Sequence, residues 1–341
     1  MKHRLWSRKI YFTLKKKTPK SRSNLYVNKC KSHFLIFFWL SIILLLFPAP
    51  GFGIRLTNVR HLFDITEELH TPSDISVSKK DGRIYVVDGV NHKIRIFNQK
   101  GKLVSSFGSE GSANGQFKFP LGIDIDRSGK VYIADSGNHR VQIFNSRGSF
   151  ISQIRIPPKN NHLADPTDVG VDDSRNRCYV VDNDNHYILA YDLSTLKLIK
   201  TYGTSGTDKR AFRYPFLIAL DKDKYLYIVD VINTRVQVLN PEGQFVAFIG
   251  EWGVEKGELF RPKGVAIDKN SRVYVSDSYT GVIQVFDANG EFYAALGDPE
   301  NGTVKKFRTP TGIFIDGQNR LYVAEMLAKK VSVYQIEGET E

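Results

Sequence analysis

The feature that most constrains the fold is a pattern that recurs six times, every 46–49 residues. Each copy has a proline, an alternating apolar run, a turn, and a hydrophobic-Tyr-[Val/Ile] segment that ends in an acidic residue. The prolines are Pro72, Pro120, Pro166, Pro215, Pro262 and Pro310. The tyrosines are Tyr85, Tyr132, Tyr179, Tyr227, Tyr274 and Tyr322, and the acidic residues are Asp88, Asp135, Asp182, Asp230, Asp277 and Glu325. Such regular spacing indicates stacked copies of one structural unit.

Each copy, called repeat one to repeat six below, is predicted to form four short strands. In repeat two these are residues 122–126, 131–134, 140–144 and 149–154, separated by turns rich in Ser, Gly and Asn. The first two strands are apolar at nearly every position, so both of their faces must be covered. Four-stranded sheets packed face to face around an axis meet this requirement. Helical repeats do not fit, because the copies lack a 3.6-residue apolar pattern.

The sequence therefore predicts an all-β, six-bladed β-propeller over residues 54–341, with four-stranded blades. Repeat six ends its third strand at Val331–Tyr334 and leaves no room for a fourth. The strand-like segment Ile54–Phe63 precedes repeat one. We expect it to pair with that third strand, closing the ring and covering an exposed sheet edge. Three residues before each proline lies an apolar anchor, namely Leu69, Phe117, Leu163, Phe212, Leu259 or Phe307.

A basic and then apolar leader precedes the repeats. Residues 1–33 form a basic region without acidic residues, and Phe34–Phe47 is apolar apart from Ser41. Fourteen residues are short for a bilayer that takes ~20, and Ala49 and Gly51 have the small-residue spacing of a cleavage site. Residues 34–53 are thus predicted to be a cleaved signal peptide or, alternatively, a retained membrane anchor. Either one exports the propeller to the periplasm or the cell exterior.

The charge of the chain resides mainly in this leader. The formal net charge is +12, but all 36 acidic residues follow Gly53, together with 37 of the 48 basic ones. The repeats are therefore close to neutral, which argues against a nucleic-acid partner. Only Cys178 follows the leader, so the repeats form no internal disulfide and no cysteine-based zinc module.

At Asp135–Phe144 (DSGNHRVQIF) the chain resembles the core of the NHL repeat. Weaker copies follow the other acidic residues, and Gly115-Gln116-Phe117 before Pro120 is similar to the loops between blades in this family. The resemblance covers residues 54–341 and implies the propeller fold. Some NHL-type proteins bind RNA or transfer ubiquitin, but the near-neutral repeats, the export leader and the lack of a Cys/His ring domain argue against both here.

Histidines invite a comparison with zinc-dependent amidating lyases that resemble NHL propellers. His92, His139 and His186 occupy the same position in successive repeats. Equivalent points on neighbouring blades should lie ~10 Å apart, whereas one zinc ion needs nitrogens within about 2.1 Å. We therefore predict that these histidines serve the repeat and that there is no metal site built on them.

Carboxylates at the channel mouth are the candidates for a small-ligand site. Asp74 and Asp168 stand two residues after their prolines, where the family usually has Gly, and Asp124 lies nearby. They are candidate ligands for a polar molecule or for Ca²⁺, as in lactonase-type propellers. The alternative is that they accept backbone N–H bonds at the rim.

The loops between repeats are irregular and are the candidates for a partner contact. Trp252, Tyr214, Phe216, Arg210 and Arg213 lie in or beside them, and aromatic and Arg side chains dominate binding hot spots. The alternative is that the aromatics only fasten the loops to the blades.

We therefore expect a monomeric, extracytoplasmic, noncatalytic scaffold that binds a protein, peptide or glycan and touches membrane only through its leader. The alternative is a lactonase- or lyase-like propeller enzyme with a cation at the channel mouth. No catalytic residue is predicted, because no Ser-His-Asp arrangement or phosphate loop occurs in the sequence.

Overall fold

The computed structural model describes residues 54–340. The predicted basic region and signal or anchor segment, residues 1–53, lie outside the described residues. In the part described, no helix is both long and apolar enough to cross a membrane. The described part is an all-β propeller whose helical content is three short 3₁₀ turns, η1 (Gly89–Asn91), η2 (Ser136–Asn138) and η3 (Met326–Ala328).

Repeats one to four each form a separate antiparallel sheet of four strands in chain order. The strands of repeats one and two are β2 (Pro72–Val77), β3 (Ile84–Asp88), β4 (Lys93–Phe97), β5 (Leu103–Phe107), β6 (Pro120–Ile125), β7 (Val131–Asp135), β8 (Arg140–Phe144) and β9 (Phe150–Arg155). Those of repeats three and four are β10 (Pro166–Asp172), β11 (Arg177–Asp182), β12 (Tyr187–Asp192), β13 (Leu198–Tyr202), β16 (Pro215–Leu220), β17 (Leu226–Asp230), β18 (Arg235–Leu239) and β19 (Phe245–Ile249).

Repeats five and six share one nine-stranded sheet with the segment that precedes repeat one. Repeat five contributes β22 (Pro262–Ile267), β23 (Val273–Asp277), β24 (Val282–Phe286), β25 (Phe292–Asp298) and the short β26 (Thr303–Val304). Repeat six contributes β27 (Pro310–Ile315), β28 (Arg320–Glu325) and β29 (Lys330–Thr340), and β1 (Leu56–Ile65) lies between β29 and β25. Two small parallel pairs, β14 (Thr204–Ser205) with β15 (Ala211–Phe212) and β20 (Glu251–Trp252) with β21 (Glu258–Leu259), lie in loops between repeats.

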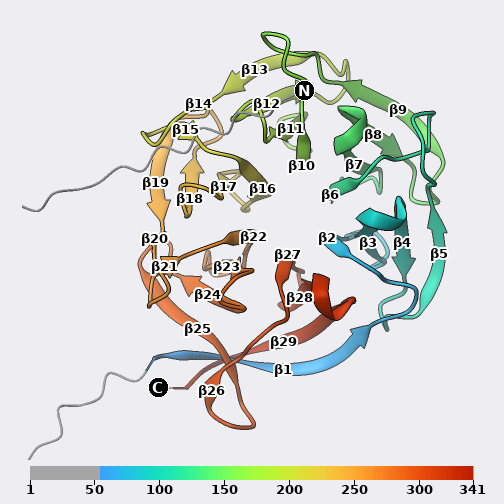
Figure 1. Ribbon diagram of the computed structural model, residues 1–341. Helices are drawn as coiled ribbons and strands as arrows, with labels where there is room; N and C mark the ends of the chain where they lie inside the picture. The colour runs from blue at the N-terminus through green and yellow to red at the C-terminus, as the bar shows by residue number, and fades with distance from the viewer. Residues whose placement is uncertain (1–53, 341) are drawn as a thin grey trace, which may run out of the picture. The chain divides into compact units, whose positions relative to one another are not determined.

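The first strands of the repeats form a closed ring around a central channel (Figure 1). Each contacts the first strand of the next repeat, in the order β2, β6, β10, β16, β22, β27 and back to β2. The buried apolar side chains divide into six clusters, and each lies between neighbouring repeats rather than at the centre. Thus each sheet is covered on both faces, as its apolar first and second strands require.

Closure by the N-terminal segment is confirmed. β1 pairs antiparallel with β29, from Leu56↔Thr340 to Ile65↔Val331. Two details differ from the prediction. The third strand of repeat six continues to Thr340 instead of ending at Tyr334, because β1 supplies a partner along its whole length. β1 also pairs in parallel with β25 over Leu56–Asn58, which joins repeats five and six into one sheet.

The prediction that Leu163 is a buried apolar anchor was wrong. The other five anchors are buried, but Leu163 is exposed and the next residue, Ala164, is buried in its place. The reason lies in the preceding loop. Phe117, Phe212 and Leu259 each pair in parallel with an earlier residue of their loop. The loop before Leu163 instead forms an antiparallel bridge between Lys159 and His162, so it follows another path.

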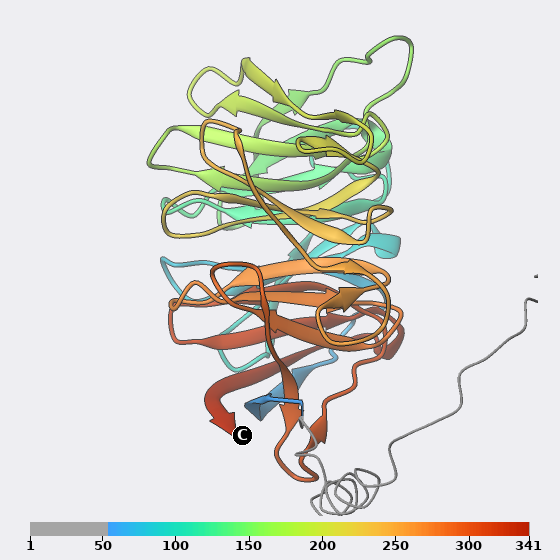
Figure 2. The ribbon, with the colours of Figure 1, turned by 90° about the vertical axis from the view of Figure 1, so that its left-hand side faces the viewer.

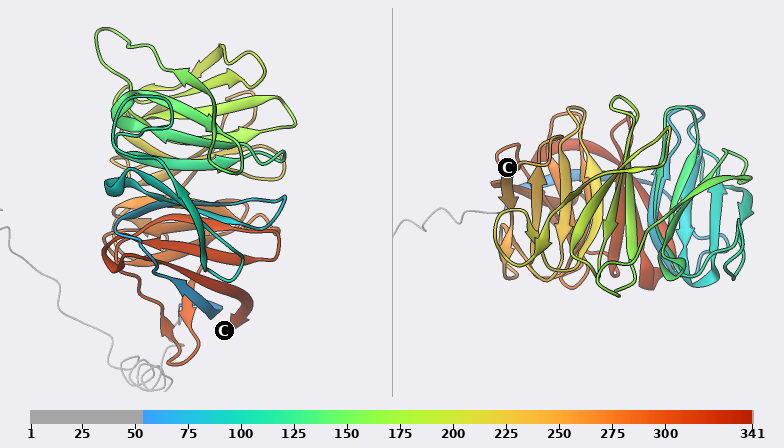
Figure 3. Two further views of the ribbon diagram at one scale, coloured as in Figure 1. Left: turned by 90° about the vertical axis from the view of Figure 1, so that its right-hand side faces the viewer. Right: turned by 90° about the horizontal axis from the view of Figure 1, so that it is seen from above.

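The ring has two different ends, which are seen edge-on in Figures 2 and 3. The loop face is the end where the first strands begin and the second strands finish, since Pro72 pairs with Asp88. It carries all the loops between repeats and the turns between second and third strands. The turn face is the opposite end and carries the tight turns, such as Ser78–Arg83 and Asn98–Lys102.

Candidate functional site

The loops of the loop face are held by the acidic residues that end the second strands. Asp277 is fully buried and accepts N–H bonds from Phe260 at 2.6 Å, Arg261 at 2.9 Å, Tyr279 at 3.0 Å and Thr280 at 2.9 Å. One carboxylate thus fixes both the incoming loop and the turn after its own strand. Charge-assisted bonds of this kind are about twice as strong as neutral ones. The periodic acidic residues are therefore structural.

The three repeated histidines also hold loops. His92, His139 and His186 have left-handed backbone φ angles of 54°, 55° and 62° at the end of a turn. The Nδ1 atoms of His92 and His186 accept the N–H groups of Phe119 and Tyr214, each at 3.1 Å. Across residues 54–340, no group of three or more His, Cys, Asp or Glu side chains is arranged to hold a metal ion. Loop anchoring accounts for the regular spacing of these rings along the chain.

Exposed apolar side chains gather on the loop face. Among residues 54–337, the large apolar side chains with high exposure fall into two sets. Five lie on outer strands, namely Val104, Ile151, Leu198, Ile199 and Val246. The other nine lie in loops or turns of the loop face, namely Val90, Phe119, Leu163, Tyr214, Ile232, Trp252, Val254, Tyr279 and Leu327. The turns of the turn face contribute none of the fourteen.

The predicted partner-contact residues all lie on this face. Trp252 is 72% exposed, Tyr214 is 45% exposed, and Arg210 and Arg213 are exposed. Phe216 is half-buried, with Nζ of Lys263 4.0 Å from its ring centre. Tyr214 is partly used to fasten its loop, because its ring lies edge-on to His186 at 4.7 Å. Trp252 is on β20 in the next loop, so the five residues span two successive connections.

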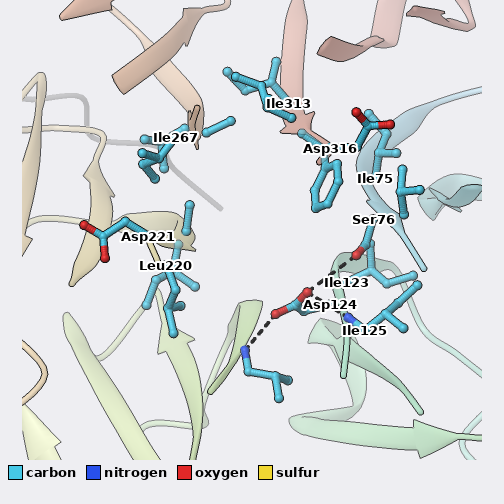
Figure 4. A pocket seen from close by; sticks show the side chains of 18 of the residues that line it. Ile75, Ser76, Ile123, Asp124, Ile125, Leu220, Asp221, Ile267, Ile313 and Asp316 are labelled. Carbon is cyan, nitrogen blue, oxygen red and sulfur yellow. Dashed lines mark hydrogen bonds between the residues drawn. The ribbon is translucent and has the colours of Figure 1, made fainter. Parts of the chain in front are cut away.

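The three carboxylates lie along the channel and link neighbouring first strands. Asp74 on β2 accepts the Ile123 N–H of β6 at 3.0 Å, and Asp168 on β10 accepts the Ile218 N–H of β16 at 2.8 Å. Asp124 on β6 accepts the Val171 N–H of β10 at 2.8 Å (Figure 4). These strands belong to different sheets, so the carboxylates supply backbone bonds that no β-ladder provides. Of the two predicted roles, the arrangement favours backbone N–H binding.

Gly122 explains why Asp168 fits at this level of the channel. A Cβ on Gly122 would collide with Oδ1 of Asp168, and one on Gly312 would collide with Oδ1 of Asp74. Gly at this position in one repeat makes room for Asp at the same position in its neighbour. In ring order a glycine therefore precedes each of the two aspartates, Gly312 before Asp74 and Gly122 before Asp168.

Burial alters the protonation of all three groups. It raises the pKa of Asp74 to about 8 and that of Asp124 to about 6, against backbone N–H bonds that lower both. The pKa of Asp168 is raised first by burial and next by the charge of Asp74. Each group therefore holds a proton more tightly than an ordinary aspartate.

A cavity of about 450 Å³ occupies the channel below these carboxylates (Figure 4). Its lining begins at Asp74 and Asp168 and continues to the turn face, where Lys79, Lys222 and Lys269 stand at its mouth. Isoleucines form much of its wall, including Ile75, Ile123, Ile267 and Ile313. The cavity does not reach the loop face, since no residue that precedes Asp74 or Asp168 in its strand lines it.

Sequence comparison places two of the repeats in a known family. The NHL repeat matches residues 69–97 and 117–144, which cover repeats one and two up to their third strands. The chain contains NHL repeats. No curated protein matches this NHL-repeat chain in sequence.

Solved structures resemble the NHL-repeat chain in fold. A gluconolactonase from Xanthomonas campestris has a TM-score of 0.64 at 13% identity, covering 85% of this chain and 94% of its own. Virginiamycin B lyase from Staphylococcus aureus has a TM-score of 0.57 at 16% identity, covering 82% and 99%. A protein of unknown function from Bacteroides thetaiotaomicron has a TM-score of 0.61 at 17% identity, covering 83% and 73%. At these identities the likeness concerns the fold alone.

Sequence reasoning did not identify most of the exposed apolar side chains of the loop face. Val90, Ile232, Tyr279 and Leu327 share one position, two residues after the acidic residue, where repeat two has Gly137. Each is between 50% and 64% exposed. The sequence contains a signal for these exposed residues, because large apolar side chains occupy the position of the turn glycine of repeat two in four of the six copies.

Proposed function

We propose that this chain is a noncatalytic binding scaffold that recognises a protein or peptide through its loop face. The observation that carries the proposal is the one-sided distribution of exposed apolar side chains. Nine of the fourteen exposed large apolar side chains of residues 54–337 lie in loops and turns of this face, and exposed apolar surface of this kind suits an interaction site. A polypeptide partner suits a face that mixes Tyr, Trp, Phe and Ile with arginines.

The scaffold supports such recognition because hydrogen bonds hold its loops in place before a partner binds. Asp277 holds four N–H groups of its loop and turn, and His92 and His186 hold two further loops. Binding to preordered loops avoids the entropy loss of ordering them on contact. A ring of sheets keeps the loops in fixed relative positions.

The wider setting is part of the same proposal. The closed ring of first strands supports six blades, if repeats five and six count as separate blades within the nine-stranded sheet. The basic and apolar pattern of residues 1–53 supports export, with the propeller outside the cytoplasm as a signal-cleaved or anchored monomer.

Site-specific photocrosslinking in the native envelope tests this function. A photoreactive amino acid at Tyr279 on the loop face should give one discrete adduct, whereas the same group at Val246 on an outer strand should give none. The captured protein should bind the purified chain, and Tyr279→Ser should weaken that binding about tenfold, as loss of a hot spot would. Equal adducts from both positions, or none from position 279, would refute the proposal.

An enzyme of the lactonase or lyase kind is the second candidate, favoured by the fold likeness to a gluconolactonase and a lyase. It would need a cation at Asp74, Asp124 and Asp168. These carboxylates do not fit a calcium ion well, because their oxygens accept backbone N–H bonds, whereas Ca²⁺ takes six to eight oxygen ligands. Stoichiometric calcium in purified protein, lost in Asp74→Ala/Asp168→Ala, would favour the enzyme instead.

A further inference from the structure

Lys263 is a half-buried cation without a carboxylate partner. It is the second residue of β22 and lies at the loop-face end of the channel. Its Nζ atom lies 4.0 Å from the ring centre of Phe216 in the preceding repeat. Among residues 54–340, no ion pair or side-chain hydrogen bond involves this ammonium group. A cation above an aromatic face is attracted by the ring, but this attraction does not replace a counter-ion for a charge removed from water.

Arg261 places a second cation beside it. The backbone of Arg261 is fixed by Asp277, which accepts its N–H at 2.9 Å, while its side chain is exposed and makes no ion pair within the described part of the chain. The pKa of Lys263 is lowered, first by burial and then by the charge of Arg261. Arg261 and Lys263 are two residues apart in the chain, and an anion that binds near both would offset the repulsion that lowers the pKa of Lys263.

Other repeats use their cations differently. Arg140 and Arg235 bind the acidic residues of their own repeats, Asp135 at 2.8 Å and Asp230 at 3.0 Å. In repeat five the corresponding residue is Val282, and Asp277 is occupied by backbone N–H groups. Lys263 and Arg261 therefore make no such pair with the acidic residue of their own repeat.

Aromatic residues accompany these cations. Phe216 lies under Lys263, and the ring of Phe260, the residue before Arg261 in the chain, lies 4.4 Å from that of Tyr279. Tyr279 is 64% exposed, and Phe260 is half-buried. The surface therefore offers positive charge and apolar contact within a few residues. A partner that matches both must present an acidic group beside an apolar one.

We propose that Lys263 and Arg261 form a carboxylate-binding site on the loop face, which takes an acidic residue or the C-terminus of a peptide segment with a neighbouring apolar side chain. This inference rests on the proposed recognition function and specifies the partner. A polypeptide fits better than a nucleic acid, because the repeats carry a formal charge near +1 and give little general attraction to a phosphate backbone.

Binding of defined hexapeptides to the purified full chain tests the site. One set carries Glu between Leu and Phe with an amidated C-terminus, and a second set has Gln at that position with a free C-terminal carboxylate. A third set has neither carboxylate, and a ten-nucleotide single-stranded RNA is the competing probe. Fluorescence anisotropy measures each affinity for wild type, Lys263→Gln, Arg261→Gln, Lys263→Arg and the turn-face control Lys269→Gln.

At least one acidic set should bind about tenfold more tightly than the uncharged set, as a charge-assisted bond implies. Lys263→Gln and Arg261→Gln should each remove about tenfold of that affinity, Lys263→Arg should restore most of it, and Lys269→Gln should change nothing. Which acidic set binds better distinguishes a side chain from a C-terminus.

Equal binding of acidic and uncharged peptides, no binding of any peptide at about 1 mM, or tighter binding of the RNA would overturn the carboxylate site. The same holds if Lys263→Gln binds as well as wild type. These outcomes would not refute the recognition function, which the crosslinking at Tyr279 tests. That crosslinking does not depend on charge, so the two proposals fail separately.

Discussion

At the scale of single residues, aspartates at different positions of the repeat have different structural roles. Asp277 at the end of a second strand gathers four N–H groups from its own repeat and its incoming loop. Asp74 and Asp168 at the start of first strands each bind an N–H of the next repeat. The first arrangement builds the loop face, and the second joins the sheets around the channel.

Gly108 and Gly115 lie in the same loop but have different surroundings. The φ angle of Gly108 is +96°, and an added Cβ would lie 2.5 Å from Cδ2 of the buried Phe117 ring and 2.8 Å from the backbone oxygen of His92. Gly115 has a φ of +82° with open space around it. The two glycines therefore separate backbone strain from collision with neighbouring atoms.

We expect Gly108→Ala to destabilise the fold more than Gly115→Ala. Both variants lose about 1–2 kcal/mol of stability to a left-handed backbone, and Gly108→Ala loses about 1–3 kcal/mol more to overpacking against Phe117 and His92. Urea denaturation of the two variants measures the difference. Equal losses in the free energy of unfolding would show that the Phe117 ring and the His92 backbone both move aside freely.

At the scale of elements, β1 has the most consequential place in the fold. It comes first in the described chain, yet it pairs with β29, the last strand, and with β25 of repeat five. Val59 and Ile65 are each 1% exposed in clusters on opposite sides of repeat six. One strand therefore joins the two ends of the ring.

Removal of β1 should sharply lower the melting temperature. A chain that begins at residue 66 loses the burial of Val59 and Ile65, worth about 1.5–3 kcal/mol each, and exposes the edge of β29. The matched control is a chain that begins at residue 54 and keeps β1. Calorimetry of both measures the effect, and equal melting temperatures would mean that β1 does not close the ring.

At the scale of the whole molecule, the channel brings ionisable groups from separate sheets into one buried space. The pKa of Asp74 is raised to about 8 and that of Asp168 is also raised, in part by the charge of Asp74. A raised carboxyl pKa means that the folded protein holds a proton which the unfolded chain has released. The contribution of such a group to stability is complete below the unfolded pKa and declines as the pH rises through the folded pKa.

Wild type should therefore lose stability between about pH 4 and pH 8 relative to Asp74→Asn, which cannot ionise. The variant keeps an oxygen that accepts the Ile123 N–H, so we expect its melting temperature to exceed that of wild type by more at pH 8.5 than at pH 5. Glu242→Gln in an exposed turn controls for general charge effects. A difference that does not change with pH would show that Asp74 is ionised throughout.

Most of the architecture could be predicted from the repeat. In repeat two the predicted strands 122–126, 131–134, 140–144 and 149–154 lie within two residues of β6, β7, β8 and β9. The prediction succeeds because strand period, turn residues and spacing agree across six copies. It was wrong at Leu163, whose loop forms a bridge between Lys159 and His162 in place of the parallel pairing that Phe117 makes in its own loop.

The candidate site was less predictable. Trp252, Tyr214, Arg210 and Arg213 could be chosen as irregular loop residues, and all four are exposed. Lys263 and Phe216 occupy the same position in successive repeats, but the period does not say that their side chains meet, which depends on the contact of β16 with β22.

The sequence by itself determined the strand pattern, the turns and the joining of the chain ends, because these follow from local periodicity and from pairing edges that must be covered. Only the tertiary structure decided what the irregular residues do. It places Asp74 and Asp168 against the N–H groups of neighbouring sheets and places most of the exposed large apolar side chains on the loop face. It also leaves Lys263 without a counter-ion. Each of these depends on distances between different repeats, which no period along the chain specifies.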